Sequence, residues 1–266
     1  MISVIMEIEI DFTESAQQNA DDFYKKSKKL LQKKAGAAQA IKDLENRLKK
    51  LKAEGKPEER ATRIKIRTQK EWYEKFHWSA TSGGLLTIGG RDAQQNEILN
   101  SKHFDSQDLF FHADIFGASV TILKGGVGAP APEREEAAQF AACYSSAWKE
   151  MLHSVDVYAM RRDQVSKSTG KGAVGTGSFL LSGEREWYRN TRLALVFFMR
   201  EERLNVVSQL TFDRMAEKPA AYVLATQGSS KKSDAAKVIS KALSYNDLDA
   251  IMQQLPAGTF HLHAVR

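Results

Sequence analysis

Cysteine is nearly absent from this 266-residue chain, because Cys143 is the only one. A single cysteine excludes an intrachain disulfide and any zinc site built from several cysteines. It is compatible with a reducing cytoplasm, which is where we expect the protein to act.

Long apolar runs are also missing. The longest, residues 193–199, has seven residues, whereas a membrane-spanning helix needs about 20. Residues 1–10 contain Glu7 and Glu9 and no basic residue, which argues against a signal peptide. With 42% hydrophobic and 27% charged residues, the composition is that of a folded globular chain. We therefore expect a folded protein that has no membrane partner.

A large excess of one charge is lacking overall, since the net charge is +6. The charge is unevenly distributed, however. Residues 1–24 carry a net −6, residues 25–78 a net +11 and residues 79–266 a net +1. This pattern is typical of a basic arm attached to a nearly neutral body.

The basic arm has the sequence pattern of a helical hairpin. After an expected strand over residues 2–10, Ser15 and Gln18 form a capping-box pattern. Apolar residues then recur at 3/4 spacing up to residue 51, a helical seam that Gly55-Lys56-Pro57 interrupts. A second helix is expected over residues 58–77. Such a hairpin is either a solvated spacer or a surface that touches RNA.

Strands and helices alternate irregularly after the hairpin, which predicts the α+β class. Helices are expected near residues 92–101, 133–153, 233–242 and 245–254, and strands at 85–88, 109–115, 118–123, 155–160, 193–199, 204–210, 221–226 and 259–264. We divide the chain into residues 1–77, a strand and coiled-coil hairpin; 78–212, a mixed sheet-and-helix domain; and 213–266, an α/β extension packed on it.

The densest polar cluster is residues 89–97, Gly-Gly-Arg-Asp-Ala-Gln-Gln-Asn-Glu. Two glycines allow close backbone approach, and a helix beginning at Asp92 would direct free N–H groups toward an anion. Arg91 would add a bidentate phosphate contact. The structural alternative is a capped turn in which Arg91 pairs with Asp92 or Glu97.

His112 and Asp114 share one face of an expected strand, because side chains alternate with a period of two. They would serve as an acid–base pair, as two metal ligands or as partners in a cross-strand hydrogen bond. No third metal ligand stands at a recognisable spacing, and we expect no metal.

Residues 170–175 match the Gly-x-Gly-x-x-Gly pattern, but a strand rather than a helix is expected to follow. This order excludes a dinucleotide site, and we expect no cofactor. The segment is better interpreted as a flexible loop whose lysines contact a phosphate backbone. Trp187 and Tyr188 would stack on unpaired bases or belong to the core.

Several blocks occur in an order and at intervals that resemble the NFACT family. The most specific is residues 88–97, and others are residues 72–78, 112–114, 117–118, 143–148, 157–158, 164–167 and 177–179. Residues 219–266 are similar to the archaeal branch. The sequence departs from the family at Glu184-Arg185-Glu186, which stands where the family has basic residues.

The resemblance implies a coiled coil followed by the RNA-binding module NFACT-R, without the NFACT-N domain. It implies a non-enzymatic protein of ribosome-associated quality control that binds the large ribosomal subunit, through rRNA or tRNA, on stalled nascent-chain complexes. The alternatives are an enzyme that acts on RNA through His112 and Asp114, and an adaptor whose coiled coil joins a separately encoded NFACT-N-like chain. The residues predicted to bind RNA are Gly89, Gly90, Arg91, Asp92, Asn96, His112, Asp114, Lys124, Arg162, Gln164, Ser166, Lys167 and Lys171.

Overall fold

The computed structural model describes residue 13 and residues 15–53, 71–169, 172–173 and 175–265. The chain forms two compact units, residues 1–68 and 69–266. Helices and antiparallel sheets occur together in the second unit, which confirms the predicted α+β class. None of the described helices is long and apolar enough to cross a membrane.

The first unit contains one long helix, α1 (Ala16–Ala53). Its start confirms the expected capping box, because Gln18 N–H donates to Ser15 Oγ and Ser15 N–H donates to Gln18 Oε1. The predicted second arm lies outside the described residues from 58 to 70, as does the predicted strand over residues 2–10. The prediction of a helix over residues 71–77 was wrong. A 3₁₀ turn, η1 (Trp72–Lys75), is followed there by a strand that begins at His77.

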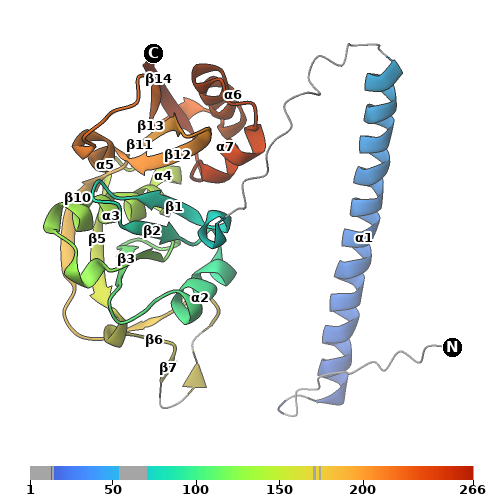
Figure 1. Cartoon of the computed structure of the whole chain (residues 1–266). Coiled ribbons are helices and arrows are strands. Elements are labelled where there is room, and N and C mark those ends of the chain that lie inside the picture. Colours follow the sequence, from blue (N-terminus) through green and yellow to red (C-terminus); the bar gives the residue numbers. More distant parts are fainter. Residues whose placement is uncertain (1–12, 14, 54–70, 170–171, 174, 266) are drawn as a thin grey trace. The chain divides into compact units, whose positions relative to one another are not determined.

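A six-stranded antiparallel sheet forms the first half of the second unit (Figure 1). All of its strands come from residues 77–192. In spatial order they are β1 (His77–Ala80), β2 (Leu86–Gly89), β4 (Thr121–Leu123), β3 (Leu109–Ala113), β5 (Ser154–Arg161) and β10 (Glu186–Arg192).

A four-stranded antiparallel sheet follows in the chain. Its spatial order is β12 (Arg203–Ser208), β11 (Leu195–Arg200), β13 (Tyr222–Ser230) and β14 (Phe260–Val265). Glu201 and Glu202 form the two-residue turn of the predicted β11–β12 hairpin, with φ values of 51° and 60°. Strands β11 and β12 precede residue 212 and strands β13 and β14 follow it, yet all four form one sheet. The predicted domain boundary at residue 212 stays a prediction.

Helix α3 (Ala131–Cys143) is buried over residues 136–143 and packs against strands of both sheets. Its alanines permit close approach, and the core around it combines Phe111 of the first sheet with Phe197 and Phe260 of the second. The predicted helix over residues 133–153 is in fact two, because Ser145 caps a new helix, α4 (Ser146–Lys149). The other helices of this unit are α2 (Ala93–Lys102), α5 (Gln209–Arg214), α6 (Lys232–Leu243) and α7 (Leu248–Gln254).

The opposite face of the six-stranded sheet carries a second apolar cluster. Phe110 and Tyr158 of the sheet pack there with Leu99 of α2. Two short strand pairs belong to this part of the chain: β6 (Val165–Ser166) with β9 (Leu180–Leu181), and β7 (Ser168–Thr169) with β8 (Gly172–Ala173). Most of the predicted RNA-binding residues lie on or beside this face.

Candidate nucleic-acid interface

Gly89, Gly90 and Asn96 are buried, and they join the end of β2 to helix α2. Gly90 N–H donates to the Val120 carbonyl at 3.0 Å, and Val120 N–H donates to Asn96 Oδ1 at 3.2 Å. A Cβ on Gly90 would lie 2.1 Å from Asn96 Oδ1, so only glycine fits. These three residues therefore shape the turn from within.

Asp92 and Arg91 point in different directions. Asp92 is exposed and caps α2, accepting from Gln95 N–H at 2.8 Å. Arg91 is half-buried, and its guanidinium donates to the Phe76 carbonyl at 3.0 Å and to Gln253 Oε1 at 3.4 Å. Burial lowers the pKa of Arg91. Its guanidinium thus connects α2 to η1 and α7.

Glu97 joins α2 to the glycine-rich loop. Lys167 Nζ lies 2.5 Å from Glu97 Oε2, and Gly177 N–H donates to the same oxygen at 3.3 Å. Lys167 also donates to the carbonyls of Gly175 and Ser178. The hydrogen bond from Lys167 holds the pKa of Glu97 below its usual value. The structure thus places two of the predicted segments, residues 89–97 and 164–167, beside each other.

Three further predicted residues precede the loop. Arg162 donates to the Val165 carbonyl at 2.8 Å and lies 5.2 Å from the centre of the Phe104 ring. Gln164 accepts from Arg161 N–H at 2.8 Å and donates to the Glu184 carbonyl at 2.7 Å. Ser166 is exposed on β6. Lys171 lies outside the described residues.

Lys124 forms a cluster with two carboxylates. It lies 2.8 Å from Asp105 Oδ2, pairs with buried Asp108 and donates to the His103 carbonyl at 3.1 Å. Burial lowers the pKa of Lys124, but the bonds to Asp105 and Asp108 outweigh it, so the net shift is upward. Lys124 is therefore a charged, partly exposed lysine with acids beside it.

His112 faces Tyr158 and not Asp114. Its Nδ1 lies 3.3 Å from the Tyr158 hydroxyl, while Asp114 is exposed beyond the end of β3. Burial lowers the pKa of His112, and hydrogen bonds to the Ala113 and Ala118 backbone and the charge of Asp114 oppose this shift. The cross-strand contact expected for His112 is thus present, but with a tyrosine. No group of three potential metal ligands occurs among the described residues.

Residues 75–183, which hold all these contacts except those to Gln253 and Glu184, match the family model described as NFACT protein RNA binding domain. The chain belongs to the NFACT family.

Several relatives carry the same NFACT segment. The archaeal Rqc2 homolog aRqcH of Methanocaldococcus jannaschii is 42% identical over 133 residues, covering 49% of this chain and 20% of that protein. Ribosome quality control complex subunit NEMF of Homo sapiens is 35% identical over 189 residues, covering 68% and 17%. Ribosome quality control complex subunit 2 of Schizosaccharomyces pombe is 32% identical over 200 residues, covering 73% and 20%. The chain thus matches about a fifth of the length of these relatives.

A solved structure, the C-terminal part of the fibronectin/fibrinogen-binding protein from Streptococcus suis, is similar at a TM-score of 0.38 and 23% identity. The match covers 69% of this NFACT chain and 78% of the Streptococcus suis chain.

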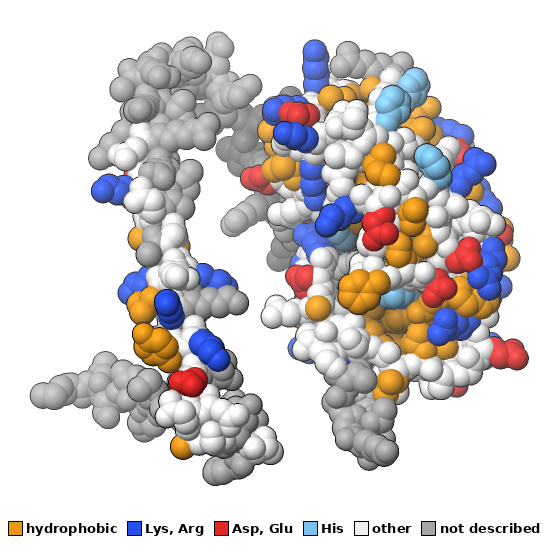
Figure 2. All heavy atoms as spheres, turned by 180° about the vertical axis from the view of Figure 1, so that it is seen from behind, with side chains coloured by type: hydrophobic (Ala, Val, Ile, Leu, Met, Phe, Trp, Pro, Cys, Tyr) orange, Lys and Arg blue, Asp and Glu red, His pale blue; other side chains and the backbone are white. Residues whose placement is uncertain are grey.

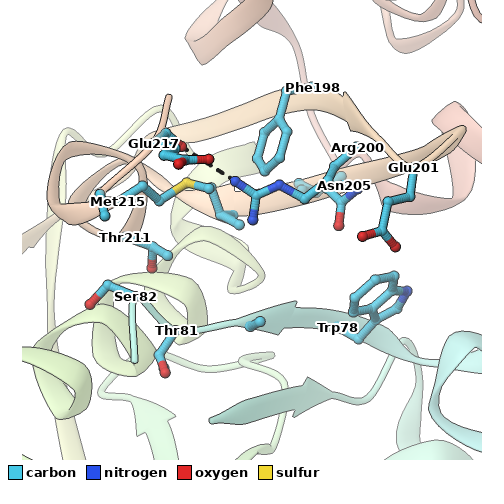
Figure 3. A pocket seen from close by; sticks show the side chains of 14 residues that line it. Trp78, Thr81, Ser82, Phe198, Arg200, Glu201, Asn205, Thr211, Met215 and Glu217 are labelled. Carbon is cyan, nitrogen blue, oxygen red and sulfur yellow. Dashed lines mark hydrogen bonds between the residues drawn. The ribbon is translucent and has the colours of Figure 1, made fainter. Parts of the chain in front are cut away.

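Two of the hollows on the described part of the unit that holds the NFACT-R domain bear on the site. The larger, of about 550 Å³, lies between edge strands β1 and β12 and is lined by Trp78, Phe198 and Arg200 among others (Figure 3). It contains none of the predicted residues. The second, of about 460 Å³, is lined by Gln164 of the predicted set and by Arg185, among charged residues of both signs.

The surface of this NFACT unit carries both charges. On the face seen in Figure 2, basic and acidic side chains are interspersed. Arg185 and Arg189 lie over aromatic rings of the six-stranded sheet and were missed from the sequence. Strand β10 itself was not predicted. The period of two along this strand would have placed Trp187 and Tyr188 on opposite faces of the sheet. Trp187 packs against the cluster that contains Phe110, and Tyr188 packs on core residue Phe111.

Proposed function

We propose that this protein binds RNA of the large ribosomal subunit, or tRNA held there, as a cytoplasmic factor of ribosome-associated quality control. The observation that carries the proposal is the match of residues 75–183 to an RNA-binding domain model. The names of the relatives place them in ribosome quality control. The net +11 of residues 25–78 supports attraction to an RNA backbone.

Among the predicted contact residues, the exposed and partly exposed ones are the candidates for direct contact. Lys124 and Lys167 keep 27% and 29% of their side chains exposed. Asp92 and Ser166 are exposed at the surface. Gly89, Gly90 and Asn96 would act indirectly, by shaping the turn in front of α2.

Co-sedimentation with purified large subunits tests the proposal. Subunits that carry peptidyl-tRNA and subunits that lack it are each mixed with the full chain at low salt. We expect the chain to pellet with the subunits and to be released as salt is raised, because counterions return to the phosphates. A chain that stays in the supernatant with both kinds of subunit at low salt would refute the proposal.

A second candidate function is that of an adaptor, in which α1 joins a separately encoded NFACT-N-like chain. It is favoured by apolar side chains that α1 leaves exposed: Tyr24 (72%), Leu30 (64%), Leu31 (63%) and Ile41 (59%). Replacing Leu30 and Leu31 by Asp is expected to abolish capture of that chain, whereas neutralising lysines of α1 is expected to leave it intact. The opposite result would exclude the adaptor role.

A further inference from the structure

Five rings form a continuous strip on the face of the six-stranded sheet opposite α3. His112, Tyr158 and Trp187 lie opposite one another on β3, β5 and β10, because His112 pairs with Tyr158 and Tyr158 with Trp187 in the strand register. Their ring centroids are 5.7 and 5.4 Å apart. Phe110 continues the strip, 6.2 Å from His112 and 6.1 Å from Phe179.

Three cations lie over this strip. Lys167 is 5.2 Å from the Phe179 centroid, Arg185 is 4.5 Å from that of Tyr158, and Arg189 is 3.8 Å from that of Trp187. Cations over aromatic faces are attracted by the ring electrons, and a guanidinium also stacks on them. The two arginines are exposed, so they form the outer layer of the strip.

The two arginines differ in their other contacts. Arg189 pairs with Asp156 at 2.6 Å and keeps 57% of its side chain exposed. Arg185 makes no ion pair or hydrogen bond with any residue that the structure describes; its contacts are with the rings of Tyr158 and Trp187. Its guanidinium is therefore available to a further partner.

The local charge argues against a simple phosphate site. Glu184 and Glu186 flank Arg185, while Asp156 pairs with Arg189 and Glu186 with Arg134, so acids balance the positive charge here. Repulsion from these acids weakens attraction to a phosphate backbone. Stacking of an unpaired base needs a planar surface rather than net charge, and both aromatic rings and guanidinium groups provide one.

We propose that Arg185 and Arg189, backed by Tyr158 and Trp187, form a platform on which unpaired RNA bases stack. This inference rests on the proposed RNA-binding function and adds the recognition mode: exposed bases of single-stranded RNA rather than a duplex. The second hollow, which Arg185 lines, lies beside this platform.

Replacement of Arg185 by Lys tests the platform in the full chain, because lysine keeps the charge and lacks the plane. The probe is a fluorescently labelled 12-nucleotide single-stranded RNA, compared with a 12-mer in which the central bases are removed but the phosphates remain. We expect Arg185→Lys to weaken binding to the intact strand about 5- to 150-fold per base stacked. The salt dependence should not change, since the charge is kept.

Arg200→Lys is the matched control, because the Arg200 guanidinium also lies over a ring, 5.7 Å from the centre of Phe198 on the other sheet. It is expected to bind both probes as wild type does. Equal affinity of Arg185→Lys and wild type for the intact strand would overturn the platform. So would an equal loss of affinity for the abasic strand, which would indicate a phosphate contact. If wild type binds neither probe nor large subunits, the proposed function itself fails, and the platform fails with it.

Discussion

Gly90 illustrates how a single residue determines the shape of the predicted interface. Its missing side chain leaves room for the Asn96 amide, which accepts from Val120 and so fixes α2 against the sheet. The pattern Gly-Gly before a helix predicts close approach of the backbone, but the group that approaches is a side chain of the same protein. From sequence alone a phosphate and an asparagine are equivalent occupants of that space.

We expect Gly90→Ala to lower the free energy of unfolding by about 1–3 kcal/mol, because overpacking at this buried site forces Asn96 to move. Urea denaturation measures the change. Gly128→Ala is the control, since a Cβ there meets no atom within 4 Å, and we expect a change below about 0.5 kcal/mol. Equal stabilities of the two variants would contradict this account.

His77 makes the stability of the second unit depend on pH. Its ring is buried and stacks on Tyr144, with centroids 3.9 Å apart. Burial, followed by the positive charge of Arg91, lowers the pKa of His77 well below its usual 6.5. Below about pH 6.5 the unfolded chain therefore binds a proton that the folded chain does not, and the free energy of unfolding falls.

We expect the urea midpoint to decrease between pH 7.5 and pH 5.5 in wild type. In His77→Phe that decrease should be smaller, and part of it should remain because burial also lowers the pKa of His103 and His112. An identical pH dependence in the variant would show that His77 titrates alike in both states.

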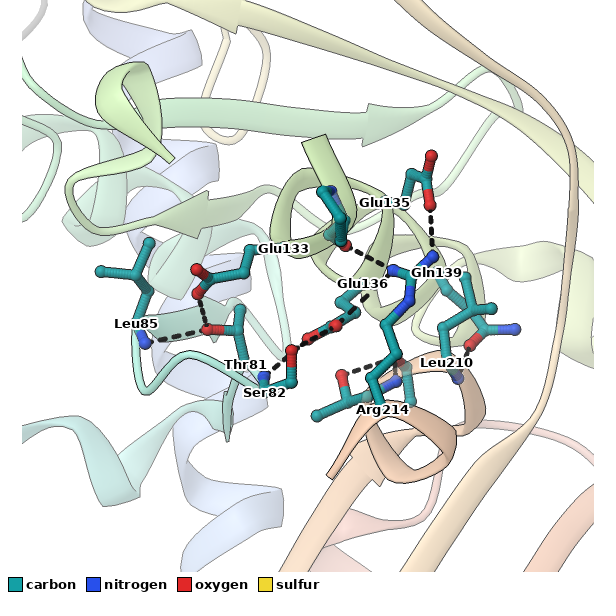
Figure 4. A network of polar contacts seen from close by, with 12 residues as sticks. Thr81, Ser82, Leu85, Glu133, Glu135, Glu136, Gln139, Leu210 and Arg214 are labelled. Atoms are coloured by element: carbon teal, nitrogen blue, oxygen red, sulfur yellow. Dashed lines mark hydrogen bonds and ion pairs between the residues drawn. The ribbon is translucent and has the colours of Figure 1, made fainter. Parts of the chain in front are cut away.

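At the scale of elements, Glu136 of α3 connects the β1–β2 turn to α5 (Figure 4). Its fully buried carboxylate accepts from Ser82 N–H and Oγ at 2.7 Å, and Arg214 Nη1 lies 3.5 Å away. Neighbouring Glu135 also pairs with Arg214, but 47% of its side chain is exposed. The same helix thus offers a buried and an exposed carboxylate that share one arginine.

Glu136→Gln is expected to cost about 1–3 kcal/mol of stability, because an amide replaces the charged acceptor of two hydrogen bonds. Glu135→Gln, its matched control, should cost less than about 1 kcal/mol, since the pair is exposed to solvent. Thermal or urea unfolding of both variants measures the difference. A larger destabilisation by Glu135→Gln would show that Arg214 depends on the exposed acid.

Local signals predicted the elements that depend on local chemistry. The start of α2 at Asp92 and the β11–β12 hairpin could be predicted from the sequence, because helix caps and tight turns depend on residues that are close in the sequence. Strand β1 was missed because residues 72–76 continue a helical spacing, whereas pairing of His77 and Ser79 with β2 decides the structure. Strand β10 was hidden by its charged residues. The ion pair of Glu97 with Lys167 joins residues 70 positions apart, and no sequence spacing indicates it.

At the scale of the whole molecule, the separation of charge predicts that α1 would provide the electrostatic part of the proposed RNA binding. We expect replacement of four exposed lysines of α1 by Gln to reduce the salt dependence of RNA binding, by about 0.7 in log–log slope for each phosphate that the variant no longer neutralises. The lysines are Lys28, Lys33, Lys34 and Lys42.

The control removes the same charge from the second unit, by replacing Lys149, Lys218, Lys231 and Lys237, which are also exposed. The two quadruple variants have equal net charge. An equal loss of salt dependence in both would indicate long-range attraction, whereas a loss only in the α1 variant would indicate that α1 itself contacts the RNA. The slope of binding affinity against salt concentration, measured with single-stranded RNA, distinguishes them.

The division of the two sheets along the chain affects how the protein folds during its own synthesis. The six-stranded sheet is complete once residue 192 has been synthesised. The four-stranded sheet is complete only after β14, which pairs with β13 and ends at Val265. At about 5–20 residues per second, that interval is on the order of ten seconds. Until then the second sheet lacks β14 and the core around α3 lacks Phe260, so newly made chains carry a transient apolar surface there.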